Sequence, residues 1–168
     1  MPTELWLLRH AKSDWPADVR SDLERPLNAR GRESAPRMGR HMAAQGWLPD
    51  RVLCSPARRT RETLEGLLGT WPVAPPVDYE PQVYEAALPD LLAALAPRLQ
   101  REGRLLLIGH NPGMLQLLRH LAQPPLALPE PKLYPTCMLA RLALDARQPL
   151  APQRAQVLGL QPVRELPA

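Results

Sequence analysis

The chain has 168 residues, 45% of them hydrophobic, and this length suits one domain, over residues 1–168, with a single core. Its formal charge of +4 would suit an acidic partner, but Lys and Arg form no block and only 4% of the residues are aromatic, which argues against nucleic acid. No apolar run approaches the length of a membrane span, so composition also argues against a membrane protein.

The first predicted element is a short buried strand that ends at a pair of polar residues. Residues 5–8 form an apolar run that stops at Arg9 and His10. Open α/β sheets bind ligands at the carboxyl ends of their strands, so this pair is expected to line a site. The polar loop of residues 12–27 follows, and we expect it to lie over the strand end and cover a pocket.

A helix is predicted over residues 28–45. Asn28 suits the N-cap, apolar side chains recur at helical spacing, and Gly46 follows the last of them. Pro36 removes one helix hydrogen bond, so either a kink or a later helix start is expected.

A second strand and helix follow over residues 50–68. Residues 50–54 predict the strand, and Ser55 is expected to cap the helix, with Pro56 at its first position. Beyond Gly69, an edge strand is predicted over residues 77–79 and a helix, bent near its proline, over residues 89–101.

A second junction between a strand and a histidine lies further along the chain. The apolar run of residues 105–108 ends at Gly109 and His110, and a helix is predicted to follow. A proline-rich connector over residues 124–135 and two further strands, at 138–144 and 155–160, complete the chain. Strands alternating with helices predict an α/β fold, a three-layer sandwich with a mostly parallel central sheet flanked by helices.

The two histidines that follow strands, together with Arg9, indicate a phosphoryl site. Guanidinium groups and the start of the helix after Ser55 offer donors to an anion, and an unprotonated imidazole nitrogen can attack phosphorus. Either histidine alone is more often an ordinary loop residue; their joint placement favours catalysis. The histidine spacing fits no metal site and arginines supply positive charge, so we expect no metal and no other cofactor.

The two cysteines are typical of a reduced protein. Cys54 and Cys137 make no disulfide framework and lack metal-ligand spacing to a histidine, and Cys54 is expected in the core. The sequence enters a strand pattern at once, without the features of a signal peptide. We therefore expect a soluble, cytoplasmic protein.

Four ordered segments resemble the histidine phosphatase superfamily, and in particular its small SixA-like branch, the phosphohistidine phosphatases. The segments are residues 8–13 (LRHAKS), residues 25–31 (RPLNARG), Ser55-Pro56 with Arg59 and Thr63, and residues 109–113 (GHNPG). The similarity covers nearly the whole chain. It implies a phosphoglycerate mutase-like fold.

The resemblance also implies roles for individual residues. His10 would be the nucleophile that becomes transiently phosphorylated, and Arg9 and Arg59 would bind phosphate. His110 would hydrogen-bond the phosphoryl oxygens, and Ser13 is expected among the substrate-binding residues. The sites expected are therefore catalytic and phosphate-binding, with no metal ligand.

The family pattern favours Arg59 over its neighbour Arg58. In that pattern the arginine stands four residues after the serine, here Ser55, and a threonine, here Thr63, stands four residues later. Arg59 and Thr63 would then share one helix face. A shift in helix register would exchange the two arginines.

Glu85 is the candidate general acid. In the mutase-like and broad-specificity branches a carboxylate protonates the departing alkoxide, but Glu85 could equally be an ordinary loop carboxylate. A phosphoramidate makes a dedicated acid optional, because a histidine nitrogen can already hold the proton that it needs to leave.

Two departures argue against a mutase. Ala11 stands where the mutase branch has glycine, and Pro16 where it usually has asparagine. The chain also lacks the insertions that enclose sugar phosphates, so a shallow, open pocket is expected. The resemblance thus implies a metal-independent phosphatase acting on protein phosphohistidine in signalling; the alternatives are a phosphatase for small phosphate esters and a non-catalytic phosphoryl-binding module.

Overall fold

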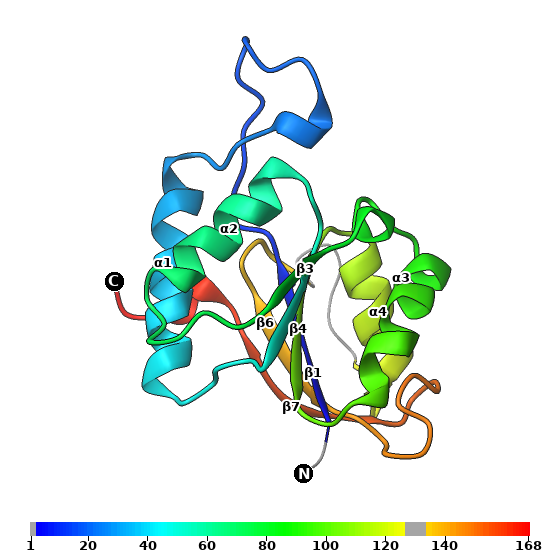
Figure 1. The fold of residues 1–168 in the computed structure, drawn as a ribbon. Helices are drawn as coiled ribbons and strands as arrows, with labels where there is room; N and C mark the ends of the chain where they lie inside the picture. The colour runs from blue at the N-terminus through cyan, green and yellow to red at the C-terminus, as the bar shows by residue number, and fades with distance from the viewer. Residues whose placement is uncertain (1–2, 127–133) are drawn as a thin grey trace.

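The computed structural model describes residues 3–126 and 134–168, which form a single seven-stranded sheet with helices on both faces (Figure 1). The strands lie in the order β3-β2-β4-β1-β6-β7-β5. They are β1 (Glu4–Arg9), β2 (Arg51–Cys54), β3 (Val77–Tyr79), β4 (Arg104–Gly109), β5 (Ala122–Gln123), β6 (Leu139–Ala143) and β7 (Ala155–Gln161). Most of the connector expected over residues 124–135 lies outside the described residues.

The sheet is mixed but mostly parallel. Strands β3, β2, β4 and β1 run parallel to one another, and β5 runs parallel to β7. Strand β6 is antiparallel to both of its neighbours, β1 and β7. The predicted α/β sandwich is therefore confirmed, while the single-domain organisation stays a prediction.

The helices form two layers around this sheet. They are α1 (Ala29–Ala44), α2 (Arg58–Leu68), α3 (Leu88–Leu95) and α4 (Gly113–Leu121), with short 3-10 turns at Asp22–Glu24, Pro81–Val83, Ala96–Gln100 and Val163–Glu165. In Figure 1, α1 and α2 cover one face, and α3 and α4 cover the other. None of the described helices has the length and apolar character needed to cross a bilayer.

The alternation of β1 explains why both faces are covered. Leu5 and Leu7 belong to the apolar cluster under α3 and α4, whereas Trp6 and Leu8 belong to the cluster under α1 and α2, and all four are buried. Burying one such leucine contributes about 1.5–3 kcal/mol. A strand that is apolar on both sides must lie at the centre of the sheet, as β1 does.

Helix α1 agrees with its prediction. Asn28 caps it by accepting a hydrogen bond from the Gly31 backbone N–H at 2.9 Å, and Pro36 lies inside the helix without delaying its start. A Cβ at Gly31 would lie 2.1 Å from the Lys12 carbonyl oxygen. Only glycine therefore lets α1 pack directly on the backbone that follows β1.

Helix α2 begins later than the sequence predicts. It starts at Arg58 with Ala57 as the cap residue, so the prediction of Ser55 as the N-cap is wrong. The Ser55 hydroxyl instead lies 2.7 Å from Nε2 of His110. The bend predicted near Pro97 is present as the 3-10 turn that follows α3.

Both cysteines are unpaired and buried, which confirms Cys54 as a core residue. Burial raises the pKa of Cys54 and that of Cys137 to about 12. Neither thiol is a thiolate near neutral pH, so neither is a nucleophile.

Candidate active site

The two strand-end histidines lie side by side. Strands β1 and β4 are parallel neighbours whose register pairs Arg9 with Gly109, so His10 and His110 follow the paired ends directly. The ring centroids are 5.5 Å apart with an interplanar angle of 54°. Both side chains are buried, with 6% and 4% of their surface exposed. The backbone pairing thus brings together two residues that are 100 positions apart in the chain.

The hydrogen bond of His10 fixes its tautomer. Its Nδ1 lies 2.7 Å from the Ala11 carbonyl oxygen, which can only accept, so Nδ1 holds the proton and Nε2 keeps a lone pair. Burial lowers the pKa of His10 to about 3, and the charges of Arg9 and Arg59 act in the same direction, against the Ala11 hydrogen bond. At neutral pH the imidazole is therefore uncharged, with a lone pair on Nε2.

In His110 the other ring nitrogen, Nε2, makes the hydrogen bond to the protein. Its Nε2 lies 2.7 Å from the Ser55 hydroxyl oxygen, which also accepts a hydrogen bond from the Ala57 N–H at 3.3 Å. If the Ser55 hydroxyl donates to Nε2, the His110 proton lies on Nδ1. Burial, with the nearby charge of Arg59, lowers the pKa of His110 to about 3.

The Nδ1 atom of His110 is available to a ligand. This atom is buried, has no hydrogen-bond partner within the described residues, and lies 3.7 Å from a carboxylate oxygen of Glu85. An N–H group in that position can donate to a phosphoryl oxygen. His10 and His110 therefore present a lone pair and a donor, respectively.

The structure places Arg59, and not Arg58, at the site. Arg59 is 1% exposed and donates to the Asp22 backbone and side chain and to Glu85, at 2.7, 2.9 and 2.6 Å. Arg58 is exposed and pairs with Glu62. The guanidinium group of Arg59 is thus held by two carboxylates from different loops.

Thr63, one turn beyond Arg59, ties α2 to the loop after β1. Its hydroxyl donates to the Arg59 carbonyl oxygen at 2.7 Å and accepts from the Ala11 N–H at 3.0 Å. This contact fixes the backbone next to His10.

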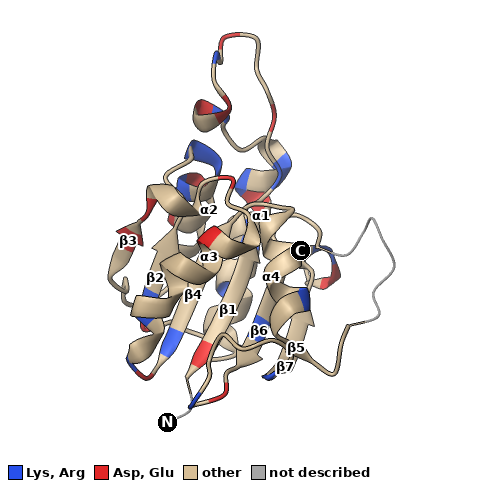
Figure 2. Ribbon diagram, turned by 90° about the vertical axis from the view of Figure 1, so that its right-hand side faces the viewer, with Lys and Arg blue, Asp and Glu red and all other residues tan. Residues whose placement is uncertain are grey.

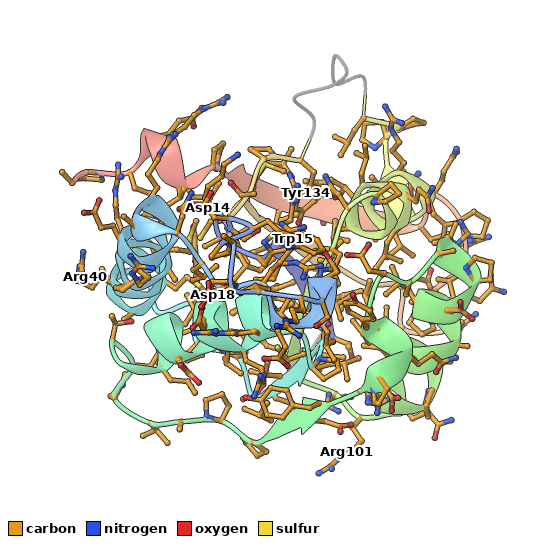
Figure 3. The ribbon with its side chains drawn as sticks, turned by 90° about the horizontal axis from the view of Figure 1, so that it is seen from above. Asp14, Trp15, Asp18, Arg40, Arg101 and Tyr134 are labelled. Carbon is orange, nitrogen blue, oxygen red and sulfur yellow. The ribbon has the colours of Figure 1, made fainter. Side chains whose placement is uncertain are left out.

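Tyr134 supports the second arginine. Its backbone carbonyl accepts hydrogen bonds from Arg9 and from Asn111, each at 3.0 Å, and its hydroxyl donates to the Leu7 carbonyl at 2.5 Å. Burial and the charge of Arg59 lower the pKa of Arg9. Tyr134, labelled in Figure 3, is fully buried and was not anticipated from the sequence.

The polar loop of residues 12–27 rises above the end of the sheet where β1 finishes, as expected (Figure 1). Arg25 donates to Ser13 at 2.6 Å and to Asp22 at 2.9 Å. The second carboxylate oxygen of Asp22 accepts from the Tyr84 hydroxyl at 2.5 Å. Although partial burial opposes the effect, hydrogen bonds from Tyr84 and Arg59 lower the pKa of Asp22, so its carboxylate stays charged.

Glu85 stands on a left-handed turn. Its φ is 48°, and the turn directs its carboxylate to Arg59. A Cβ at Gly113 would lie 2.3 Å from the Ala86 carbonyl oxygen, so this glycine allows the Glu85 loop to pack on the start of α4, beside His110.

These groups enclose a cavity of about 220 Å³. It brings together all the site residues expected from the sequence, which are Arg9, His10, Ser13, Arg59, Glu85 and His110. Sequence reasoning missed the remaining lining residues, Lys12, Arg25, Asn111 and Thr136, although the first three lie inside the family segments. Arg59, the second residue of α2, lines the cavity, so the start of this helix contributes a side chain to the site.

The charges that line the cavity suit an anion. Four cationic side chains and one carboxylate line it, next to two neutral imidazoles. A tetrahedral phosphoryl group matches this combination of guanidinium donors and a nucleophilic nitrogen. Within residues 3–126 and 134–168, no group of three or more His, Cys, Asp or Glu side chains could hold a metal ion.

Residues 5–92 match a model of the histidine phosphatase superfamily (branch 1). The chain is 43% identical over 63 residues to an uncharacterized chloroplastic protein of Arabidopsis thaliana. These 63 residues cover 38% of this chain and 29% of that protein. It is 33% identical over 105 residues to an uncharacterized protein of Mycobacterium tuberculosis, covering 62% of this chain and 63% of that one. The chain thus spans less than two thirds of the length of these curated relatives.

Solved structures resemble nearly the whole chain. A structure from Agrobacterium tumefaciens assigned to the phosphohistidine phosphatase SixA has a TM-score of 0.80 at 28% identity, covering 96% of this chain and 99% of that one. The protein histidine phosphatase SixA complexed with tungstate has the same TM-score at 21% identity, with 96% and 98% covered, and shows a shared fold. From the family match over residues 5–92 and the two histidines at paired strand ends, we conclude that the chain belongs to the histidine phosphatase superfamily.

Proposed function

We propose that this protein is a phosphatase that forms a covalent phosphohistidine intermediate on His10 and that its substrate is phosphohistidine on a protein. The observation that supports it is the single neutral tautomer of His10, set by Ala11 in a cavity that also holds the buried Arg59 and the half-buried Arg9. A nucleophile with its lone pair fixed beside guanidinium groups needs little rearrangement to attack phosphorus.

In the first step, Nε2 of His10 attacks the phosphorus atom and the bond from phosphorus to the substrate nitrogen breaks. Arg9, Arg59 and the Nδ1–H of His110 stabilise the charge on the equatorial oxygens. The departing imidazole leaves neutral because its other ring nitrogen already holds a proton. The phosphoryl group now resides on His10.

In the second step, water attacks the phosphorus atom of phosphorylated His10. The bond from phosphorus to Nε2 breaks, inorganic phosphate forms, and the water proton passes to a base or to solvent. Glu85, 2.6 Å from Arg59 and 3.7 Å from His110, is the carboxylate near enough to accept it.

The substrate class is inferred from the leaving group and from relatives. A phosphoramidate requires no strong acid, which suits a site whose candidate acid, Glu85, is already paired with Arg59. The solved structure with 28% identity and a second, from Nakamurella, with 27% identity are both assigned to the phosphohistidine phosphatase SixA. Both support the same substrate for this chain.

The test compares synthetic phosphohistidine peptides with a panel of aryl and alkyl phosphates, using the wild type and Glu85→Gln. We expect turnover of the peptides by both proteins. A large loss caused by Glu85→Gln on the phosphate esters alone would make Glu85 an acid for oxygen leaving groups. Turnover of the esters without turnover of the peptides would instead assign a small-molecule phosphatase.

His10→Ala tests the intermediate. The substitution should reduce turnover of any phosphoryl substrate by at least about 10⁴-fold, because the covalent step is lost. His41→Ala, on α1 and outside the cavity, is the matched control and should keep activity. Acid-labile phosphate trapped on the wild type and absent from His10→Ala would confirm the intermediate; binding of phosphate without such an adduct would indicate a non-catalytic phosphoryl-binding module. Metal independence and a cytoplasmic setting stay predictions.

A further inference from the structure

A second cavity, of about 190 Å³, adjoins the catalytic one. Lys12 and Thr136 line both cavities, so a ligand that occupies the first extends past these two side chains into the second. The other charged residues that line the second cavity are Arg30, at the start of α1, and Arg164, near the C-terminus. The proposed mechanism uses none of these three cations.

The second cavity is strongly cationic. Lys12, Arg30 and Arg164 line it, and no Asp or Glu does. Figure 2 shows Lys and Arg gathered at the upper ends of α1 and α2, beneath the loop. Three cations around one cavity create a positive potential that favours an anion.

These cations differ in their partners from the arginines that line the first cavity. Arg9, Arg25 and Arg59 each donate side-chain hydrogen bonds to neighbouring groups. Within the described ranges, no ion pair or side-chain hydrogen bond is formed by the three cations of the second cavity. Their charge is therefore available to a ligand.

The segments that present the three cations are fixed to one another. The Asn28 N–H donates to the Lys12 carbonyl at 2.9 Å, and the start of α1 packs on Lys12 at Gly31. Arg37 of α1 donates to the backbone carbonyls of Pro167, at 2.8 Å, and of Leu166, which joins the C-terminal segment to the same helix. The cavity is thus preformed.

We propose that this cationic cavity binds a carboxylate side chain of the phosphorylated protein while its phosphohistidine occupies the catalytic cavity. The inference rests on the proposed function and adds a substrate preference to it. Lys12, Arg30 and Arg164 are all solvent-exposed, which suits an anion presented on the surface of another protein. The preferred substrate therefore has Asp or Glu close to its phosphohistidine.

The experiment measures kcat/KM on two phosphohistidine peptides that differ only at flanking positions, with Asp and Glu in one and Asn and Gln in the other. The wild type should prefer the acidic peptide by about tenfold, since each exposed ion pair adds only a small factor to binding. Added salt should weaken the preference. The double variant Arg30→Gln, Arg164→Gln should remove it, and should leave turnover of phosphoramidate, a small substrate, unchanged.

The matched control is Arg40→Gln with Arg147→Gln, which removes the same charge elsewhere. Arg40 is on α1 as well but points away from the centre of the molecule (Figure 3), and both arginines are exposed. This control should keep the full preference for the acidic peptide. A loss equal to that of the first double variant would mean that net charge, and not the cavity, sets the preference.

The remaining outcomes separate this inference from the proposed function. If both peptides are hydrolysed equally by the wild type, or if the Arg30 and Arg164 variant keeps the preference, the carboxylate site is wrong and the function stands. If phosphoramidate is hydrolysed and neither peptide is, the protein substrate is wrong and the carboxylate site fails with it. If the variant loses activity only on a small bisphosphorylated ester, the cavity binds a second phosphate, which also overturns the proposal.

Discussion

The histidines and the carboxylates of the site are held in different ways. His10 and His110 follow two central parallel strands, and the backbone register sets their separation. Asp22 lies on a 3-10 turn and Glu85 on a left-handed turn, and both reach the site through side-chain contacts with Arg59. The comparison indicates that the sheet fixes the positions of the two imidazoles, whereas the loops adjust the charge around them.

The largest effect expected from this comparison is on proton binding. The pKa of each histidine falls from 6.5 to about 3, more than a thousandfold in proton affinity, because burial disfavours the charged form. NMR titration of the imidazole signals should show both rings neutral at pH 5. A midpoint near 6.5 would mean that the strand ends are far more hydrated than their burial indicates.

The same shifts have a consequence for stability. Between pH 6.5 and about 3, the unfolded chain binds protons at these histidines that the folded chain does not. Their contribution to the free energy of unfolding therefore decreases as the pH falls through this window. Chemical denaturation at pH 7 and pH 5 should show the loss, and a variant with both histidines replaced by glutamine should lose less.

Arg59→Ala, which removes the group that joins the two loops to the site, should have the next largest effect. We expect kcat to fall by about 10²–10³-fold, as when a preorganised donor to a transition state is lost. Arg58→Ala is the matched control because it removes only an exposed pair with Glu62, and it should leave kcat unchanged. Equal losses in the two variants, or a full loss of folding in Arg59→Lys, would contradict a role for Arg59 in phosphate binding.

Ser55→Ala tests whether the Ser55 hydroxyl, in addition to the strand register, sets the tautomer of His110. Without the hydroxyl, Nε2 of His110 loses its partner at 2.7 Å and the Nδ1–H tautomer is no longer fixed. We expect kcat to fall about tenfold, the effect of one hydrogen bond, with a smaller change in KM. The ¹⁵N signals of His110 should report a change of tautomer. The control is Ser21→Ala, because the Ser21 hydroxyl makes no capping hydrogen bond, and this variant should leave kcat and the His110 signals unchanged.

Asp22→Asn should have the smallest effect. It removes a negative charge from Arg59, so inorganic phosphate should inhibit about threefold more strongly, within the range of a partly exposed ion pair. Inhibition constants for the two proteins would measure this change. Weaker inhibition would show instead that Asp22 acts mainly by positioning Arg59.

The sequence predicted the parts of the site that depend on local patterns. The apolar runs before His10 and His110 identify two buried strands. Both histidines were therefore expected at the carboxyl ends of the strands, where α/β sheets bind ligands. The resemblance to the family pattern, with Ser55, Arg59 and Thr63 at its spacing, identified one side of α2. These features extend over a few residues and need no knowledge of distant contacts.

The missed features depend on contacts between distant segments. Asp22 bonds to Arg59, 37 residues away, and to Tyr84, 62 residues away. The wrong N-cap has the same cause, since the hydroxyl of Ser55 bonds to His110, 55 residues further on. Capping preferences describe neighbours in the chain, so they do not include such a competing partner.

The pairing of Arg9 with Gly109 has a consequence for how such proteins diversify. Because main-chain hydrogen bonds set the distance between the two imidazoles, insertions or exchanges in the surrounding loops leave the reactive pair intact. New specificity can thus arise through changes at the rim alone, while the chemistry inherited at the strand ends persists.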